Sequence, residues 1–153
     1  MITTQYKKEL LYRKVNGKRF IGDYISKVTS LFLVNENDLE FMSLEDTDEI
    51  LSFSKEINFK NERIKLLPHE LSGFFRGLKN DNSSYYVFID EDWKYCGSFV
   101  IPSLFLLNER FTFGKEIIND ILLISTDLSK IISLDYYEVN KKYFIDITNS
   151  LSM

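Results

Sequence analysis

Several residue types that support common kinds of protein are scarce in this sequence. It has one cysteine, Cys96, and one histidine, His69, among 153 residues. A single cysteine cannot form an intramolecular disulfide, so the fold does not depend on an oxidising compartment. A single histidine excludes a metal site with two imidazole ligands. We therefore expect a cytoplasmic protein, and we predict neither a metal nor another cofactor.

Long apolar runs and catalytic motifs are also missing. No run is long enough to span a bilayer, and residues 1–30 lack the uninterrupted apolar core of a signal peptide. The glycine-rich phosphate-binding motifs and the nucleophile motif of hydrolases do not occur either. These absences count against a membrane partner, a nucleotide-using enzyme and a hydrolase, and we predict no catalytic residues.

Aromatic residues, by contrast, are abundant. Thirteen Phe and nine Tyr stand against two Pro and six Gly, and aromatic side chains favour the half-buried surface of a sheet. Hydrophobic residues make up 44% and charged residues 27%, which is the balance of a soluble globular protein. The length fits one domain that buries about two-thirds of the surface exposed by its unfolded chain.

The net charge of −4 hides an uneven distribution. Residues 1–34 hold seven Lys/Arg and two Asp/Glu, whereas the other 119 residues hold 12 Lys/Arg and 21 Asp/Glu. A protein that binds nucleic acid directly is expected to be basic over its binding domain, and most of this chain is acidic. The distribution suits a protein partner that has a basic face.

The start of the chain is predicted to form strands, or a helix followed by a hairpin. Asn16–Gly17 is a typical turn dipeptide with apolar residues on both sides, which favours a hairpin. A short helix over residues 6–15 is the alternative. The apolar run Leu31–Val34 predicts a buried strand, and the alternation at Leu39–Phe41 predicts a strand that returns beside it.

Helix signals follow. Ser43 and the acids after it suit a helix start, and the apolar spacing beyond them predicts a helix at about 45–57. The polar run after this helix should break it. Pro68 suits the first turn of a second helix, at about 68–79. The Phe74–Phe75 pair on its apolar face should dock on a sheet.

The rest of the chain is predicted to be mainly strands. Residues 84–89 and 94–101 are rich in aromatic and β-branched residues and flank the acidic turn Asp90–Asp92, which predicts a hairpin. A loop with a short strand at 111–113 and a helical turn at 115–119 should follow. Short connections between the last strands predict an antiparallel meander. Its strands are expected at 120–125, 130–138 and 143–148.

These elements together predict one α+β domain. It should be mainly antiparallel sheet, with a C-terminal three-strand meander and two or three short helices packed on one side. Its expected parts are N-terminal strands or a helix plus a hairpin at 1–42, helices at 43–79 and antiparallel strands at 83–148.

Few residues are candidates for chemistry. His69 stands beside Glu70 at the predicted helix start without a positioned nucleophile, so a surface or capping role is expected. Cys96 falls within a strand pattern and should be a buried thiol rather than a nucleophile. The Asp90–Asp92 turn has the oxygen ligands that a divalent cation needs. The glycine and ligand spacing of an EF-hand is absent, however, and such clusters usually keep a hairpin tip solvated.

The clearest charge feature is a run of acids. Between Glu36 and Glu49 the sequence has seven acids and no base. One interpretation is a solvated loop and helix face, and the other is a docking surface for a basic protein. Trp93 and the acids before it suggest a second patch with an aromatic anchor. The residues predicted to bind the partner are Glu36, Asp38, Glu45, Asp46, Asp48, Glu49, Asp90, Glu91, Asp92 and Trp93.

A motif in the middle of the chain resembles a known pattern. The segment Leu67-Pro68-His69-Glu70-Leu71, followed by Phe74-Phe75 and Asn80-Asp81-Asn82, resembles the L-P-x-x-(Y/L)-x-x-F-(L/Y)-x-x-x-N-G pattern of the SUKH superfamily. The helix pattern before it and the strand pair at 120–137 extend the resemblance to about residues 45–138. The glycine that ends the pattern is replaced here, and the first 40 residues have no counterpart.

The resemblance implies a function. Many bacterial members of that superfamily are immunity proteins, which bind and neutralise the toxin domain of a polymorphic or contact-dependent growth inhibition system. By this resemblance the chain is expected to be an inhibitor and not an enzyme, with a cognate toxin domain as its partner, and to be a monomer or weak homodimer. The alternatives are a phage or mobile-element inhibitor of a host enzyme, and a small carboxylate-based enzyme.

Overall fold

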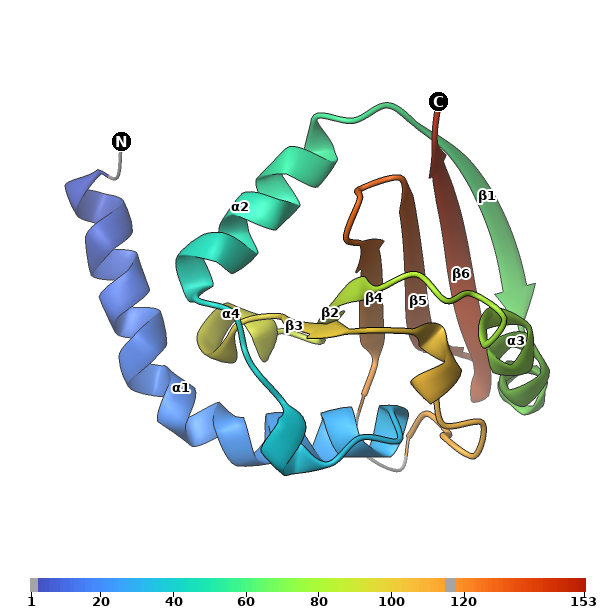
Figure 1. The fold of residues 1–153 in the computed structure, drawn as a ribbon. Coiled ribbons are helices and arrows are strands. Elements are labelled where there is room, and N and C mark those ends of the chain that lie inside the picture. Colours follow the sequence, from blue (N-terminus) through green and yellow to red (C-terminus); the bar gives the residue numbers. More distant parts are fainter. Residues whose placement is uncertain (1–2, 115–117) are drawn as a thin grey trace.

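A six-stranded antiparallel sheet forms the body of the structure, a computed structural model that describes residues 3–114 and 118–153 (Figure 1). The strands lie in the order β1-β6-β5-β4-β2-β3. Their bounds are β1 Phe59–Leu66, β2 Tyr85–Ile89, β3 Phe99–Ile101, β4 Asp120–Ser125, β5 Lys130–Val139 and β6 Lys142–Ser152. Tight turns join β4 to β5 and β5 to β6. The predicted α+β domain with its C-terminal meander is confirmed.

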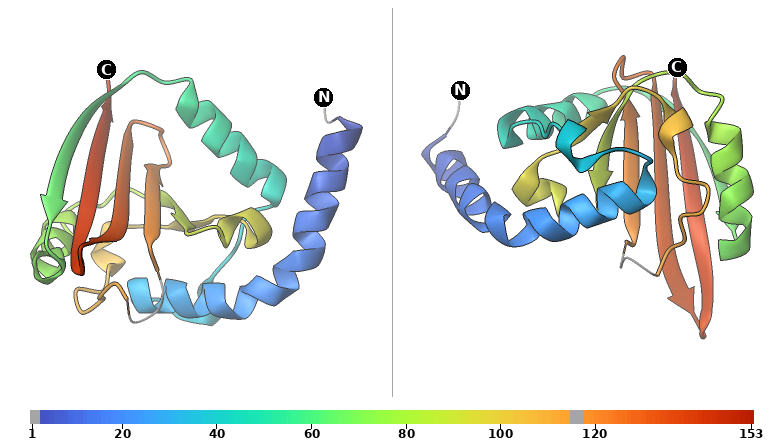
Figure 2. Two further views of the ribbon diagram at one scale, coloured as in Figure 1. Left: turned by 180° about the vertical axis from the view of Figure 1, so that it is seen from behind. Right: turned by 60° about the horizontal axis from the view of Figure 1, so that its bottom comes forward.

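Helices surround the sheet and differ greatly in length (Figure 2). The helices and 3₁₀ turns of the described residues are α1 Thr4–Leu31, η1 Glu36–Asp38, α2 Leu44–Lys55, η2 Pro68–Glu70, α3 Leu71–Leu78, α4 Trp93–Cys96 and η3 Leu104–Leu106. The first of them has 28 residues, so the helices are not all short as predicted. None of those described is long and apolar enough to cross a membrane.

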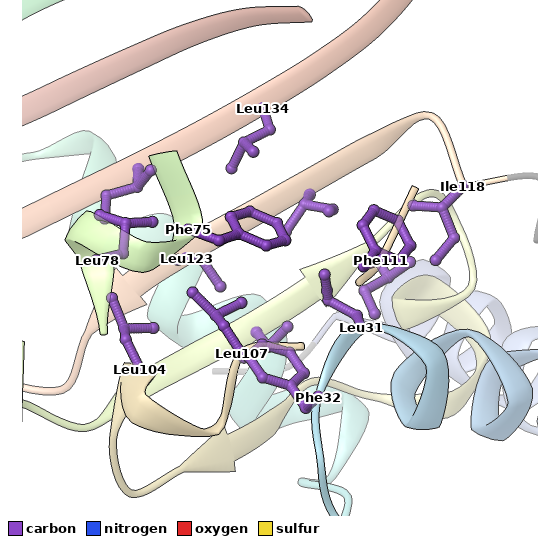
Figure 3. Packing of buried hydrophobic residues seen from close by; sticks show 14 of the residues in the cluster. Leu31, Phe32, Phe75, Leu78, Leu104, Leu107, Phe111, Ile118, Leu123 and Leu134 are labelled. Carbon is purple, nitrogen blue, oxygen red and sulfur yellow. The ribbon is translucent and has the colours of Figure 1, made fainter. Parts of the chain in front are cut away.

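The main core lies on one face of the sheet. Val87, Leu123 and Leu134 alternate with residues of the opposite face, and they pack with Phe75 of α3 and Leu31 of α1 (Figure 3). Each of these side chains is at most 2% exposed. The second half of α1 and the whole of α3 are therefore bound to this face by burial of apolar surface.

A smaller cluster lies on the other face. Phe88 and Ile124, which neighbour Val87 and Leu123 in their strands, pack with Ile50 of α2. Because successive residues of a strand point to opposite faces, α2 covers the face opposite to α3. The expected packing on one side thus applies to α1 and α3, while α2 lies across the sheet from them.

The two helices predicted in the middle of the chain are present. Ser43 caps α2, since its hydroxyl oxygen accepts a hydrogen bond of 3.1 Å from the backbone N–H of Asp46. The second helix begins as a 3₁₀ turn at Pro68 and continues as α3. Its Phe75 is buried in the core as expected, and Phe74 is partly buried against it.

The predicted hairpin at the start of the chain is wrong, and the alternative of a helix holds over a longer range. Asn16 lies inside α1, where its side-chain N–H donates to the carbonyl of Tyr12 at 2.8 Å. Gly17 serves close packing instead of a turn, because a Cβ atom there would lie 2.7 Å from the carbonyl oxygen of Tyr95. Thr3 caps this helix through its hydroxyl group.

Helix α1 has two dissimilar halves. It is bent, and its first half stands beside α2 and α4 while its second half runs along the core (Figure 1). The second half buries Tyr24, Val28 and Leu31 completely. The first half buries only Leu10 and Arg13. The first half therefore depends on a few specific contacts for its position.

The two strands predicted around residues 31–41 are wrong. Leu31 ends α1, and Phe32 makes only an isolated β-bridge to Leu107. Phe41 makes another isolated bridge, to Phe99. Neither segment forms a regular strand, because Phe32 and Phe41 reach the main core from a loop. The apolar run in the sequence reflects this burial and not a strand.

The predicted strand at 94–101 is only partly right. Its first residues form the helical turn α4, and only Phe99–Ile101 pairs with β2. Gly97 separates the two with a φ of +90°, and a Cβ atom there would lie 2.1 Å from the carbonyl oxygen of Met42. A residue with a side chain could not make this turn, which the sequence pattern did not reveal.

Strand β1 was not predicted at all. Every residue between Phe59 and Leu66 is exposed, although the strand pairs with β6 along its whole length. An edge strand with both faces exposed has no apolar alternation, so its sequence resembles a polar loop. The strand predicted at 111–113 is absent, and Phe111 and Phe113 enter the core from a loop. The helical turn predicted at 115–119 lies largely outside the described residues.

Candidate partner-binding site

Part of the predicted acidic surface is bound to α1. The guanidinium of Arg13 donates to both carboxylate oxygens of Asp48, at 2.7 and 2.9 Å, and Tyr6 donates its hydroxyl proton to the same group at 2.5 Å. Burial and this bond raise the pKa of Tyr6 to about 12. Next to them, Lys14 pairs with Glu45 at 3.1 Å. Asp48 and Glu45 therefore hold α1 on α2.

The second predicted patch is also largely internal. Lys27 of α1 pairs with Asp90 at 2.8 Å and with Asp92 at 3.2 Å. The other carboxylate oxygen of Asp90 accepts from the backbone N–H groups of Asn119 and Asp120. Asp92 is only 7% exposed, and burial raises its pKa. These two acids fix the second half of α1 to the turn after β2.

The remaining two residues of that patch differ from each other. Glu91 is exposed and pairs with Lys94 at 3.3 Å. Trp93 is half-buried and packs edge-to-face on Phe88, with ring centroids 5.6 Å apart. Trp93 also lines a groove of about 470 Å³ between α1, α2 and α4, which we call the α1–α4 groove. This groove is lined by Tyr6, Glu9, Tyr12, Arg13, Asp48, Trp93, Lys94 and Tyr95.

The α1–α4 groove is balanced in charge. Two acidic and two basic side chains line it. The Arg13–Asp48 pair forms its floor, where the Arg13 side chain is 9% exposed and the Asp48 side chain 26%. The third donor of Arg13 is bound to the carbonyl of Lys94 at 2.5 Å. With these donors and acceptors already paired, the groove shows no preference for a charged ligand of either sign.

Four predicted acids stay unpaired within the described part of the chain: Glu36, Asp38, Asp46 and Glu49 are all exposed and form no ion pair there. They do not form one surface. Figure 1 places the η1 turn, with Glu36 and Asp38, beside the second half of α1, whereas Asp46 and Glu49 lie on α2. The acidic run of the sequence is therefore divided between two places.

Asp46 and Glu49 border a second groove, of about 260 Å³, which we call the α2 groove. It lies where α2 crosses the sheet, between α2, strand β2 and the turn after β4. Its lining residues are Met42, Asp46, Glu49, Ile50, Phe53, Tyr86, Thr126 and Leu128. Both of its charged groups are acids.

The α2 groove has an apolar floor. Ile50 is buried on Phe88 and Ile124, with Tyr86 and Leu128 packed against the same cluster. One turn further along α2, Phe53 is 48% exposed. Phe53 and the two unpaired acids therefore lie together on the exposed side of α2, next to the apolar floor. Sequence analysis did not single out Phe53, although its place on an acidic helix was a usable signal.

Leu128 reaches this groove from a strained turn. Its φ is +62°, a conformation that bulky residues rarely adopt. Hydrogen bonds within the turn hold it there, because Asp127 accepts from the hydroxyl of Ser129 at 2.7 Å and from that of Ser125 at 2.8 Å. The turn therefore directs a leucine side chain to a place where glycine or asparagine would relieve the backbone.

A row of acids crosses the uncovered part of the sheet. Asp120, Asp135 and Asp146 stand opposite one another on β4, β5 and β6, and Lys65 of β1 ends the row. Burial and a hydrogen bond to Asp135 raise the pKa of Asp120 to about 6. Asp135 and Asp146 line a polar hollow of about 390 Å³.

The other candidates for chemistry have ordinary surroundings. His69 is exposed on the η2 turn. Cys96 is half-buried, and burial together with the charge of Asp92 raises the pKa of its thiol to about 11, which disfavours the reactive thiolate. Among residues 3–114 and 118–153, no group of three or more His, Cys, Asp or Glu side chains has an arrangement suited to a metal ion.

Comparisons of the chain with protein-family models, with curated proteins and with solved structures found no match. The resemblance to the SUKH superfamily therefore remains a hypothesis based on the motif around Pro68, which the structure places at the start of η2 and α3.

Proposed function

We propose that this protein is an inhibitor that binds another protein, and specifically an immunity protein that neutralises a cognate bacterial toxin domain in the cytoplasm. It acts by covering the active face or the target-binding face of the toxin. It performs no catalysis itself and needs no cofactor. The acidic surface takes the place that a nucleic acid substrate or another anionic target occupies on a basic toxin.

The α2 groove carries this function. Asp46 and Glu49 are exposed and unpaired within the described residues, and an apolar floor with the half-exposed Phe53 lies directly beside them. Exposed acids steer a basic partner during encounter, and an apolar floor supplies the burial that holds a complex together. The other predicted acids contribute to the general negative field or hold α1 in place.

Co-expression with a candidate toxin domain, chosen from the products of genes that neighbour this protein's gene, tests the proposed function. We expect the two proteins to co-purify, with a dissociation constant below about 1 μM, since weaker binding would not protect a cell. A catalytically inactive toxin variant serves for the binding measurement. No binding at that affinity, or a toxin that stays fully active in the complex, would contradict the proposed function.

The carboxyl pair on the sheet supports a second candidate, a small carboxylate-based enzyme. A carboxyl with a raised pKa is suited to general acid catalysis. Asp120 has a raised pKa, and its partner Asp135 lines the polar hollow. We rank this enzyme below the inhibitor, because the proton of Asp120 is already engaged in the hydrogen bond to Asp135 and is not directed at a substrate. A host-enzyme inhibitor from a phage would use the same α2 groove as an immunity protein.

A further inference from the structure

We infer that the α2 groove binds a short basic and apolar segment of the partner, with a Lys or Arg side chain beside Asp46 and Glu49 and an apolar side chain on the floor. This rests on the proposed function and deepens it by naming the surface and the chemistry of the segment. The same groove excludes an acidic segment, because two carboxylates stand at its rim.

The size of the groove favours side chains over a small molecule. Its volume is about 260 Å³, whereas pockets that enclose a drug-sized ligand usually have at least about 300 Å³. One large side chain or two small ones fill such a space. A segment that lies across it can also contact Tyr86 and Thr126 at the end near the sheet.

The charges select a basic side chain. Asp46 and Glu49 are three positions apart on α2, so their carboxylates lie on one side of the helix, one turn apart. Two bases of α1, Arg13 and Lys14, pair with other acids of α2, namely Asp48 and Glu45, and neither base lines the groove. A cation that enters the α2 groove therefore meets two carboxylates that no lining base neutralises.

The strained turn at Leu128 is an independent sign of function. A leucine with a φ of +62° is strained, because bulky side chains clash with the backbone in the left-handed conformation. The hydrogen bonds accepted by Asp127 hold this turn, and the Leu128 side chain packs on the floor of the groove. Strained backbone concentrates at binding and catalytic sites, and here it builds one wall of the groove.

A peptide titration followed by two-dimensional ¹⁵N–¹H NMR tests the inference without the toxin. The probe is the acetylated and amidated pentapeptide Lys-Leu-Arg-Leu-Lys. We expect saturable shifts at the amides of Ile50, Phe53, Tyr86 and Leu128. Two control peptides, one with Glu at the three basic positions and one with Ser at the two Leu positions, should give clearly smaller shifts, since each lacks one half of the recognition.

Protein variants sharpen the test. Asp46→Asn combined with Glu49→Gln should weaken peptide binding about five- to tenfold, because both carboxylates that attract the basic side chains of the peptide lose their charge. Leu128→Gly should weaken it as well while relieving the turn, so that the fold is retained. The matched control, Glu36→Gln combined with Asp38→Asn, makes the same change of net charge outside the groove and should leave the affinity unchanged.

Three results would overturn the inference: no saturable shift at about 5 mM peptide, equal binding of the Glu-containing peptide, or shifts confined to another surface. The outcome is separable from that of the proposed function. A toxin domain that binds tightly with no contribution from the α2 groove would leave the inhibitor function intact and place its interface elsewhere. If the peptide binds as expected but no toxin domain binds, the groove is a binding site for basic segments and the proposed toxin-neutralising function is wrong.

Discussion

Arg13 joins three elements through one side chain. Its guanidinium binds both oxygens of Asp48 on α2 and the carbonyl of Lys94 on α4, and the side chain is only 9% exposed. Loss of the guanidinium leaves the carbonyl of Lys94 without this donor and leaves the Asp48 carboxylate with the hydroxyl of Tyr6 as its remaining side-chain donor. We expect Arg13→Met to lower the free energy of unfolding by about 2 kcal/mol, which urea unfolding followed by the fluorescence of Trp93 measures.

Lys14→Met is the matched control for Arg13. It removes one positive charge at the next position of the same helix, but its pair with Glu45 is exposed, with side-chain exposures of 54% and 38%. Such pairs contribute less than about 1 kcal/mol. Equal losses for the two variants would show that net charge, and not the Arg13–Asp48 contact, holds the first half of α1.

Asp120 predicts a specific pH dependence of stability. Its folded-state pKa of about 6 lies above its ordinary value of 3.8, because burial and the bond to Asp135 favour the protonated form. The folded state therefore binds the proton more tightly than the unfolded state, and stability falls as the pH rises from about 4 to about 6. Asp120→Asn should remove this fall and raise the melting temperature at pH 7.

Asp127 provides a contrast with the opposite sign. Hydrogen bonds from Ser129 and Ser125 lower its pKa, so it contributes stability above its ordinary pKa that is lost as the pH falls. Asp127→Asn should therefore reduce stability at pH 7 and leave the fall between pH 4 and 6 in place. Thermal unfolding at several pH values distinguishes the two variants. An Asp120→Asn profile parallel to that of the unchanged protein would contradict the shared proton.

At the scale of elements, two glycines of α1 make a direct comparison. Alanine normally stabilises a helix interior by about 0.8–1.0 kcal/mol relative to glycine. Gly22 has no atom within 4 Å of the position of a Cβ, so Gly22→Ala should show this gain. Gly17→Ala should instead lower stability, because its Cβ would lie 2.7 Å from the carbonyl of Tyr95. Denaturant unfolding of the two variants measures both signs.

A gain of stability at both positions would contradict the close packing of α1 on α4. The outcome also bears on the interpretation of the sequence. Asn16–Gly17 has the composition of a turn, yet Gly17 is used for the absence of its side chain and not for its backbone freedom. Contacts between residues 78 positions apart in the chain decide this, and local pattern contains no information on them.

The elements that the sequence predicts correctly are those whose local pattern agrees with their packing, and the elements it misses depend on contacts between distant segments. Helix α2 has a capping serine and one apolar stripe, and the meander has alternating strands with tight turns, so local pattern and packing agree. Strand β1 is exposed at every residue between its two ends and forms through pairing with β6. Helix α4 depends on Gly97, whose close approach to Met42 only the folded chain shows.

At the scale of the whole molecule, the uneven charge of the sequence is partly used inside the fold. Bases of α1 pair with acids from two other segments: Arg13 with Asp48, and Lys27 with Asp90. The sequence predicted an acidic surface, but it could not indicate which acids would form ion pairs with the basic side chains of α1. Of the ten residues predicted to bind a partner, Asp46 and Glu49 lie at a groove with both charge and apolar floor.

The unpaired acids at the α2 groove predict how a basic partner associates. Asp46→Lys combined with Glu49→Lys should slow association with the toxin domain at low salt by about tenfold and flatten its dependence on salt, because steering by exposed charge is screened over about 10 Å at 0.1 M ionic strength. Stopped-flow fluorescence at low and at physiological salt measures the rate. The fold should be unaffected, since neither acid has an intramolecular ion pair among the described residues.

The control for this reversal is Glu36→Lys combined with Asp38→Lys. It changes the net charge equally, on the η1 turn beside the second half of α1, away from the α2 groove (Figure 1). If position matters, the control slows association less and leaves the dissociation rate unchanged, whereas the reversal at α2 also speeds dissociation because the cation of the partner loses both carboxylates. If the two double variants behave alike, the whole field of the protein attracts the partner and the α2 groove is not its place of contact.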